Sequence, residues 1–319
     1  IFILSGVSSF PALTGAGLRE MAKTMDIRIV EGGIAPSPFA GIGLNVMRAV
    51  VGYAGAPVKL RRGGRDGHGI GLAESLRYTA AVPGRLPLRN IHFSLVDVPD
   101  LQLIPRAWPA ITDIWMGAGP VPEILHRILN LLAKTRARFH LPSFEPFSRL
   151  FYAVLNRMRF GEHRGGMFIR ARGLVDERPA ERSWHLLAEG DDGPYIPSMA
   201  IEAIVRKLRT GDRPAAGARS SVDALTLADY DALFDGRSIH TGFRSEEAGA
   251  PLYRQILGAA FDTLPPQLRS LHGSKAERRW QGHAEVRRGT GLLARLAAGI
   301  IGFPKAAASV PVTVAFTAQ

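Results

Sequence analysis

Apolar runs and polar turns alternate along the first part of the chain in the manner of an α/β protein. The opening run Ile1–Leu4 predicts a buried strand, the turn Ser5–Ser9 follows it, and Leu13–Met21 has helical spacing. In a doubly wound fold this order places the turn at the ligand-bearing edge of a parallel sheet. Further patterns predict strands at 26–34 and 91–98, a helix at 44–53, and an exposed loop or hairpin at 59–71.

Two later segments have the strongest helical periodicity, Pro122–Arg138 and Phe147–Met158. Each carries a broad apolar face with arginines opposite it. We expect these faces to be buried in the protein at Ile124, Leu125, Ile128, Leu129, Phe151, Val154 and Leu155. A basic amphipathic helix can also lie on a membrane surface, and this alternative stays open.

The middle of the chain predicts an antiparallel hairpin from Gly166–Val175 and Arg182–Glu189, whose connection contains Pro179. A loop follows at 190–197, and a helix capped by Ser198 is predicted up to Arg209. The Pro- and Gly-rich segment 211–217 is expected to be a turn, and Thr226 is expected to cap a short helix that ends at Phe234. The C-terminal run Val310–Phe316 alternates like a strand.

These elements predict an α/β plus α+β protein of more than one domain. Residues 1–25 are expected to be the last strand, turn and helix of a doubly wound nucleotide-binding domain. Residues 26–243 would form an α+β substrate domain with a mixed sheet, and 250–319 the beginning of a C-terminal α+β domain, with the linker at Arg244–Gly249. Because the first strand begins at Ile1, we expect its partner strands upstream and the chain to be part of a longer protein.

Composition excludes several classes of protein. The absence of cysteine excludes disulfides, thiol nucleophiles and Cys-ligated metals, and none of the nine histidines has the spacing of a zinc motif. No Gly-x-Ser-x-Gly elbow is present. The net charge of +12 comes from arginines spread along the chain, which does not favour nucleic-acid binding. No apolar run is long enough to span a membrane, so we expect a cytoplasmic globular protein.

Several short strings carry a family resemblance, namely Ser5–Thr14, Gly32–Ser37, Tyr53–Pro57, Val98–Asp100, Gly165–Met167, Trp184–Ala188 and Gly193–Pro197. Together they resemble saccharopine-dehydrogenase-like oxidoreductases over residues 1–243. Residues 251–319 resemble the opening of a bacterial domain of unknown function that is often fused behind this family, on strings such as Leu264–Pro266 and Gly302–Pro304.

The resemblance implies an NAD(P)-binding domain followed by a mixed-sheet domain over the active-site cleft. It places the cofactor beside the turn Gly6, Val7, Ser8 and Ser9. The family's Gly-rich phosphate motif lies upstream of the first strand and is missing here. Gly41-Ile42-Gly43 follows a Pro-rich loop, and we interpret it as a chance match. This chain alone is therefore not expected to hold NAD(P) tightly.

Two side chains are candidate substrate contacts. Pro194 and Pro197 restrict the backbone around Tyr195, which favours a substrate-binding role for that ring, with a packed tyrosine as the alternative. Arg170 could hold a carboxylate, with a solvent-facing arginine as the alternative. We expect Tyr195 and the Ser8-Ser9 turn to line one cleft. Acidic pairs at 97 with 100 and at 191 with 192 are expected to form turns.

Two functions follow from these patterns. The first is the substrate-domain part of an NAD(P)-dependent oxidoreductase that acts on a lipid-like or acyl small molecule, because no side-chain cluster suited to an amino-acid substrate is evident. The second is a non-catalytic scaffold or a peripheral module on a membrane surface that retains the fold. No metal site is expected, catalytic residues are not identified, and the pattern does not define an oligomeric state.

Overall fold

The computed structural model describes residues 1–7, 11–120, 123–157, 160–245, 252–272, 278–287, 289, 291 and 306–316. The chain divides into two compact units, Ile1–Glu247 and Ala248–Gln319. The predicted linker at Arg244–Gly249 lies outside the described residues from position 246 onward. Among the described residues, no helix has both the length and the apolar content needed to cross a bilayer.

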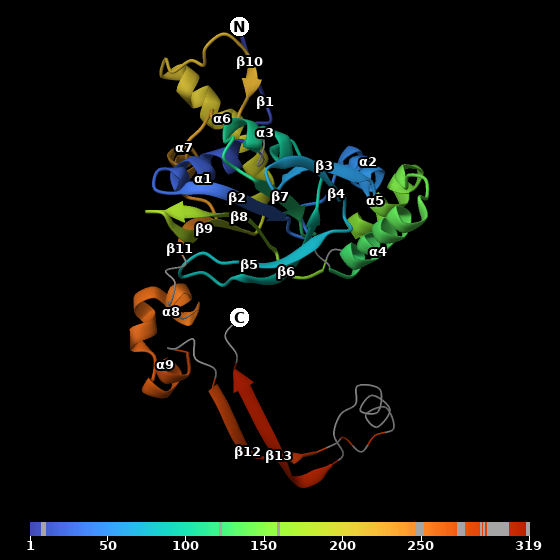
Figure 1. Ribbon diagram of the computed structural model, residues 1–319, viewed down its shortest axis with the longest axis vertical. Coiled ribbons are helices and arrows are strands. Elements are labelled where there is room, and N and C mark those ends of the chain that lie inside the picture. Colours follow the sequence, from blue (N-terminus) through green and yellow to red (C-terminus); the bar gives the residue numbers. More distant parts are fainter. Residues whose placement is uncertain are drawn as a thin grey trace. The chain divides into compact units, whose positions relative to one another are not determined.

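The first unit is built on a seven-stranded mixed sheet in the order β11-β9-β8-β2-β7-β6-β5 (Figure 1). Its strands are β2 (Asp26–Ala35), β5 (Ser75–Ala80), β6 (Leu88–Leu95), β7 (Asp113–Ala118), β8 (Arg164–Val175), β9 (Arg178–Glu189) and β11 (Ile239–Ser245). The central pair β2 and β7 is parallel, and the other neighbours are antiparallel. The predicted mixed α/β architecture is confirmed.

Two small sheets accompany the large one. β3 (Pro57–Arg62) and β4 (Arg65–Ile70) form an antiparallel hairpin, and β1 (Phe2–Ser5) pairs in parallel with β10 (Gly217–Ser220). β1 therefore has a partner downstream in the chain, which the sequence pattern did not predict. The partner strand contains a single apolar residue, Ala218, so no alternation marks it in the sequence.

Helices cover one face of the large sheet (Figure 1). They are α1 (Ala12–Ala22), α3 (Asp100–Ala107), α6 (Ile196–Arg209) and α7 (Leu227–Phe234). The main core joins Leu13 and Met21 of α1 to Val30 of β2 and Ile169 of β8, all of them buried. Residues 12–22 therefore share a core with the sheet of residues 26–245. Because side chains alternate along a strand, Glu31 and Arg170 point to the opposite face.

The hairpin of β8 and β9 is confirmed and is longer than predicted. Its turn is the pair Asp176 and Glu177, both in the left-handed region with φ 48° and 61°, the conformation that a tight two-residue hairpin requires. The capping of α7 by Thr226 is also confirmed, with Asp229 completing the capping box. The cap predicted at Ser198 is wrong, because α6 begins at Ile196 and the Ser198 hydroxyl donates to the Tyr195 carbonyl at 2.8 Å.

A second group of helices lies beside β5 and β6 and consists of α2 (Leu44–Tyr53), α4 (Glu123–Phe139), η1 (Glu145–Phe147) and α5 (Ser148–Arg157). They meet in an apolar cluster around Met47, Val51 and Leu129. Of the side chains predicted to be buried, Leu129 is confirmed, and Leu125, Phe151 and Leu155 are half-buried. The prediction is wrong for Ile124, Ile128 and Val154, which are exposed because the helices pack through another face.

The second unit contains α8 (Leu252–Leu257), η3 (Gly258–Thr263), α9 (Pro266–His272), β12 (Arg278–Val286) and β13 (Ala307–Phe316). The two strands pair antiparallel, with Gln281 opposite Thr313. The strand predicted at Val310–Phe316 is thus confirmed and begins three residues earlier.

Candidate functional site

A cavity of about 340 Å³ opens where the end of β2 meets the beginning of β8 and the loop after β9. Its lining residues come from these three segments and are Ile34–Ser37, Ala40, Gly41, Gly165–Met167, Leu186, Ala188, Gly190, Gly193, Pro194, Ile196 and Pro197. The cavity volume lies within the range of small-molecule sites. The sequence strings at 32–37, 165–167 and 193–197 are thus brought together at one place.

Glycines form a large part of this wall because the chain segments approach each other closely. A Cβ at Gly165 would lie 2.9 Å from the Ala35 carbonyl oxygen, and one at Gly166 would lie 2.8 Å from the Leu186 carbonyl oxygen. Gly41 and Gly190 have φ of 66° and 58°, which favours glycine. The wall therefore offers backbone and small apolar surfaces to a ligand.

None of the described residues that line the cavity is titratable. The one hydroxyl in the lining belongs to Ser37, whose Oγ accepts a hydrogen bond from the Phe39 amide at 3.2 Å. Just outside the lining, His163 Nε2 lies 3.1 Å from Asp191 Oδ1, and the His163 ring contacts Phe39 at 4.6 Å between centroids. The cavity can bind an apolar group, while charged chemistry is confined to its surroundings.

Tyr195 lies in η2 (Gly193–Tyr195), between residues that line the cavity. Its own side chain is not part of the lining and is exposed, with the Arg237 guanidinium 5.5 Å from the ring centroid. Arg237 is in turn 3.3 Å from Asp192, whose carboxylate also accepts the Ser238 amide at 2.7 Å. Gly193, Pro194, Ile196 and Pro197 thus line the cavity while Tyr195 does not. Substrate contact by the Tyr195 ring, and a cleft shared with the Ser8-Ser9 turn, stay predictions.

Arg170 is engaged with carboxylates on the opposite face of the sheet from Met167. Its Nε donates to Glu31 Oε2 at 2.8 Å, Glu181 lies 3.7 Å away, and the guanidinium stacks over the Tyr78 ring at 5.2 Å. Burial opposes the charge, but the two carboxylates prevail and raise the pKa of Arg170. The Arg170 guanidinium is already paired, so a substrate carboxylate would have to displace Glu31. The substrate role of Arg170 stays a prediction.

The predicted cofactor turn is described only in part, because Ser8 and Ser9 lie outside the described residues. Gly6 has φ 75°, and a Cβ there would lie 2.6 Å from the Pro11 ring. The Gly6 carbonyl accepts the Ser221 hydroxyl at 2.6 Å, and the Ser221 amide donates to Ser5 at 2.8 Å. Ser5 and Gly6 are thus tied to the loop after β10, and the cofactor role of Gly6 and Val7 stays a prediction.

The segment Gly41-Ile42-Gly43 precedes α2, so its fit to a dinucleotide phosphate can be examined. The Asn156 side chain clamps Ile42, accepting from its amide and donating to its carbonyl, both at 3.1 Å. A phosphate cradle needs free amides at this point, and the amide of Ile42 is occupied. The Ile42 amide is therefore not free to bind the pyrophosphate of NAD(P), and the interpretation of this string as a chance match stays a prediction.

Two buried polar groups were not singled out by the sequence patterns. Asp100 was expected in a turn, but it is the first residue of α3 and is fully buried, and burial raises its pKa to about 7. His185 is also fully buried, with Nε2 2.9 Å from the Tyr78 hydroxyl and Nδ1 3.0 Å from the Ala81 amide. Burial lowers the pKa of His185 to about 4, so it is neutral. The described residues contain no cluster of His, Asp and Glu suited to a metal ion.

Comparison with known proteins gives two findings. A family model described as "Domain of unknown function (DUF4166)" matches residues 264–319, within the second unit. The structure is similar to apo histidine-tagged saccharopine dehydrogenase (L-Glu forming) from Saccharomyces cerevisiae, with 10% identity, a TM-score of 0.44, and coverage of 76% of this chain and 71% of that chain. No curated protein matches the sequence. At this identity and TM-score the likeness bears on neither substrate nor residue roles.

Proposed function

We propose that this chain supplies the substrate-binding part of an NAD(P)-dependent oxidoreductase resembling saccharopine dehydrogenase, and that its cavity holds the apolar part of a lipid-like or acyl substrate. The observation that carries the substrate class is the lining of the cavity, which consists of apolar side chains and glycine backbone without a titratable side chain. A compact charged substrate would find no partner for its charge in this wall.

The apolar side chains of the lining support an acyl chain as the ligand. Burial of an apolar chain contributes about 0.8 kcal/mol for each methylene that leaves water. A lining made of Ile34, Met167, Leu186 and Ile196 provides such an environment, and polar groups are restricted to the backbone and Ser37. Specificity for the polar end of the substrate would come from groups beside the lining, because Asp191 follows the lining residue Gly190 and its Oδ1 lies 3.1 Å from His163 Nε2.

Binding of a homologous ligand series tests the proposal. Straight-chain acyl thioesters of N-acetylcysteamine, each one methylene longer than the last, would be titrated into the 319-residue chain by calorimetry. The dissociation constant is expected to fall by about fourfold for each added methylene. The series should reach a plateau when the cavity is filled. A dissociation constant that does not change with chain length would contradict the proposal.

A variant that fills the cavity, compared with a matched control elsewhere on the surface, tests where the ligand binds. Ala40 lines the cavity from a loop and is half-buried, so Ala40→Phe should add a ring to the lining with little effect on the core. Ala40→Phe is expected to weaken binding of the best thioester by at least about tenfold, which is the loss of two or more methylenes. Ala216→Phe, in an exposed loop away from the cavity, should bind like the parent chain. Equal binding by both variants would place the ligand elsewhere.

A further inference from the structure

Helix α4 has its polar and apolar faces in an unusual arrangement. The face packed against the rest of the unit contains His126 and Asn130, both buried, beside Leu129 and Ala133. The opposite face carries large apolar side chains, spaced as one continuous stripe along the helix. This outer stripe consists of Ile124, Ile128, Leu131 and Phe139, which are 56%, 47%, 65% and 67% exposed.

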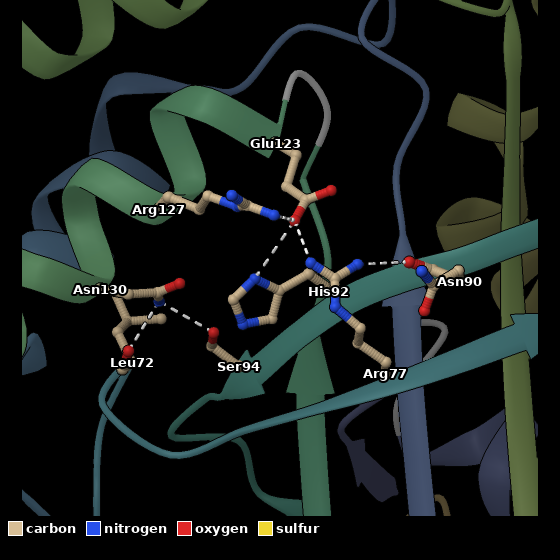
Figure 2. Close-up of polar contacts among 8 residues, drawn as sticks. All are labelled: Leu72, Arg77, Asn90, His92, Ser94, Glu123, Arg127 and Asn130. Carbon is tan, nitrogen blue, oxygen red and sulfur yellow. Dashed lines mark hydrogen bonds and ion pairs between the residues drawn. The ribbon is translucent and has the colours of Figure 1, made fainter. Parts of the chain in front are cut away.

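Specific polar contacts fix this rotation of the helix (Figure 2). The Asn130 amide donates to the Leu72 carbonyl at 2.7 Å and to the Ser94 hydroxyl at 2.9 Å. At the beginning of the helix, Glu123 forms ion pairs with Arg77 of β5 and with Arg127. The contact of Glu123 with Arg77 and those of Asn130 with Leu72 and Ser94 hold α4 at two points about two turns apart, so the outer stripe cannot turn inward.

The inward face of α4 buries polar side chains, which costs free energy. Hydrophobic packing alone therefore does not explain which face of the helix is turned inward. His126 is buried with neither ring nitrogen hydrogen-bonded within the described part of the chain. Burial lowers the pKa of His126 to about 4, so the ring is neutral. A buried polar group without a partner costs free energy, while four large apolar side chains face outward. Such a surface normally marks a binding site.

The charges beside the outer stripe indicate the partner. Arg127, Lys134 and Arg138 are spaced seven and four residues apart, so they form a row along one side of the stripe. The described residues of α4 contain one acidic side chain, Glu123, at the first turn. A second copy of this chain would bring two rows of cations together, which opposes self-association. An apolar stripe with a cationic border matches an anionic lipid surface.

Helix α5 repeats the arrangement on a smaller scale. It carries the exposed apolar side chains Leu150 and Val154, preceded by Phe147 of η1, and its basic residues are Arg149 and Arg157. The helices are held together through the apolar cluster that joins Leu129 of α4 to the half-buried side of α5. The same group of helices therefore presents apolar and basic side chains to solvent from two of its members.

We propose that the outer stripe of α4 docks this protein on the surface of an anionic lipid bilayer. The helix would lie parallel to the membrane, with Ile124, Ile128 and Leu131 in the acyl-chain boundary and the row of basic residues at the lipid headgroups. This proposal rests on α4 and not on the cavity, so it holds whether or not the cavity binds an acyl chain.

Co-sedimentation with vesicles tests the docking surface. The 319-residue chain is expected to bind vesicles of phosphatidylglycerol and phosphatidylcholine. The double variant Ile128→Glu with Leu131→Glu should lose at least about tenfold in partition coefficient. The matched control is Ile201→Glu with Val205→Glu on α6, where the two side chains are similarly exposed at 53% and 48%. The control should bind like the parent chain, and circular dichroism checks that each variant is folded.

A second pair of measurements tests the charge and the depth of insertion. Lys134→Glu with Arg138→Glu should weaken binding to anionic vesicles by about tenfold or more, since basic residues near such a surface are attracted by its negative potential. Because the chain has no cysteine, Leu131→Cys can be labelled with an environment-sensitive fluorophore at a single site. Its emission should shift to the blue on vesicle addition, whereas that of labelled Ile201→Cys should not.

Three results would overturn the proposal. The first is a parent chain that does not bind anionic vesicles. The second is equal loss of binding in the α4 and α6 variants, which would remove the role of the outer stripe. The third is a dimer in light scattering that becomes a monomer with Ile128→Glu and Leu131→Glu, which would assign the stripe to a second copy of the chain.

Discussion

Asp100 follows Pro99 in a segment that reads as an exposed turn, yet its side chain is fully buried. Its carboxyl group is fully buried at the start of α3, near the Thr14 hydroxyl of α1. Neither carboxyl oxygen has a hydrogen-bond partner among the described residues. Burial raises the pKa of Asp100 to about 7, and the nearby Thr14 hydroxyl opposes this shift only in part. A buried acid of this kind makes the stability of the fold depend on pH.

The folded chain retains the Asp100 proton that the unfolded chain releases between about pH 4 and about pH 7. The contribution of Asp100 to the free energy of unfolding is therefore present below pH 4 and is lost as the pH rises through this window. The loss amounts to about 1.4 kcal/mol per pH unit. Asp100→Asn should remove this slope and be more stable than the parent chain at about pH 8, as measured by urea unfolding.

The control for this prediction is Asp97→Asn, three residues earlier and exposed. It should keep the pH dependence of the parent chain, because it leaves the buried carboxyl group of Asp100 in place. An Asp100→Asn variant with the parental slope between about pH 4 and about pH 7 would contradict the burial of a protonated carboxyl group at this position.

At the scale of the element, α1 shows how closely a helix can approach a neighbouring segment. A Cβ at Gly15 would overlap the carbonyl oxygen of Val222, and Arg19 from the same helix donates to the carbonyls of Val222 and Leu225. A Cβ at Gly17 would meet only the terminal carbon of Ile169 at 2.8 Å. We therefore expect an alanine to be tolerated at Gly17 and not at Gly15, two residues earlier.

Gly15→Ala should lower the free energy of unfolding by about 1–3 kcal/mol, because the backbone of residue 222 has to move. Gly17→Ala should change it by less than about 1 kcal/mol, since the Ile169 side chain can rotate and alanine has the higher helix propensity. Urea unfolding of both variants measures the difference. A Gly15→Ala variant as stable as Gly17→Ala would mean that α1 does not pack this closely on the loop after β10.

Helix α4 shows that hydrophobic periodicity can locate a helix without specifying which of its faces is buried. The pattern over 122–138 correctly indicates a helix, which the structure has at Glu123–Phe139. Its apolar face is broad, so the pattern does not specify which part of that face packs inward. Asn130 decides this, because its contacts with Leu72 and Ser94 come from segments 36 or more residues away in sequence. The burial predicted for Ile124 and Ile128 failed for this reason.

At the scale of the whole molecule, binding of the nucleotide is the most direct test of how this chain takes part in the proposed reaction. The described residues at Gly41–Gly43 do not form a phosphate cradle, because Asn156 occupies the Ile42 backbone. The 319-residue chain should therefore bind NADH and NADPH with a dissociation constant of about 1 mM or weaker. Calorimetry measures this directly. Micromolar binding would mean that the turn at Gly6 and Val7 suffices for the cofactor.

The amino-acid sequence by itself determined most of the local structure. Alternation and spacing locate β2, α2 and the β8–β9 hairpin, because these depend on neighbouring residues. The capping of α7 by Thr226 is local for the same reason. The strings Gly32–Ser37, Gly165–Met167 and Gly193–Pro197 are visible in the sequence, although nothing in their spacing shows that they line one cavity.

Which faces are buried and which residues share a site depends on long-range contacts in the fold. The parallel pairing of β1 with β10 joins segments more than 210 residues apart, and a four-residue strand carries no pattern that would indicate it. The engagement of Arg170 with Glu31 and the burial of Asp100 depend on packing across the sheet and between helices. Local propensity acts over a few residues, whereas burial and charge pairing depend on contacts that exist only once the chain is folded.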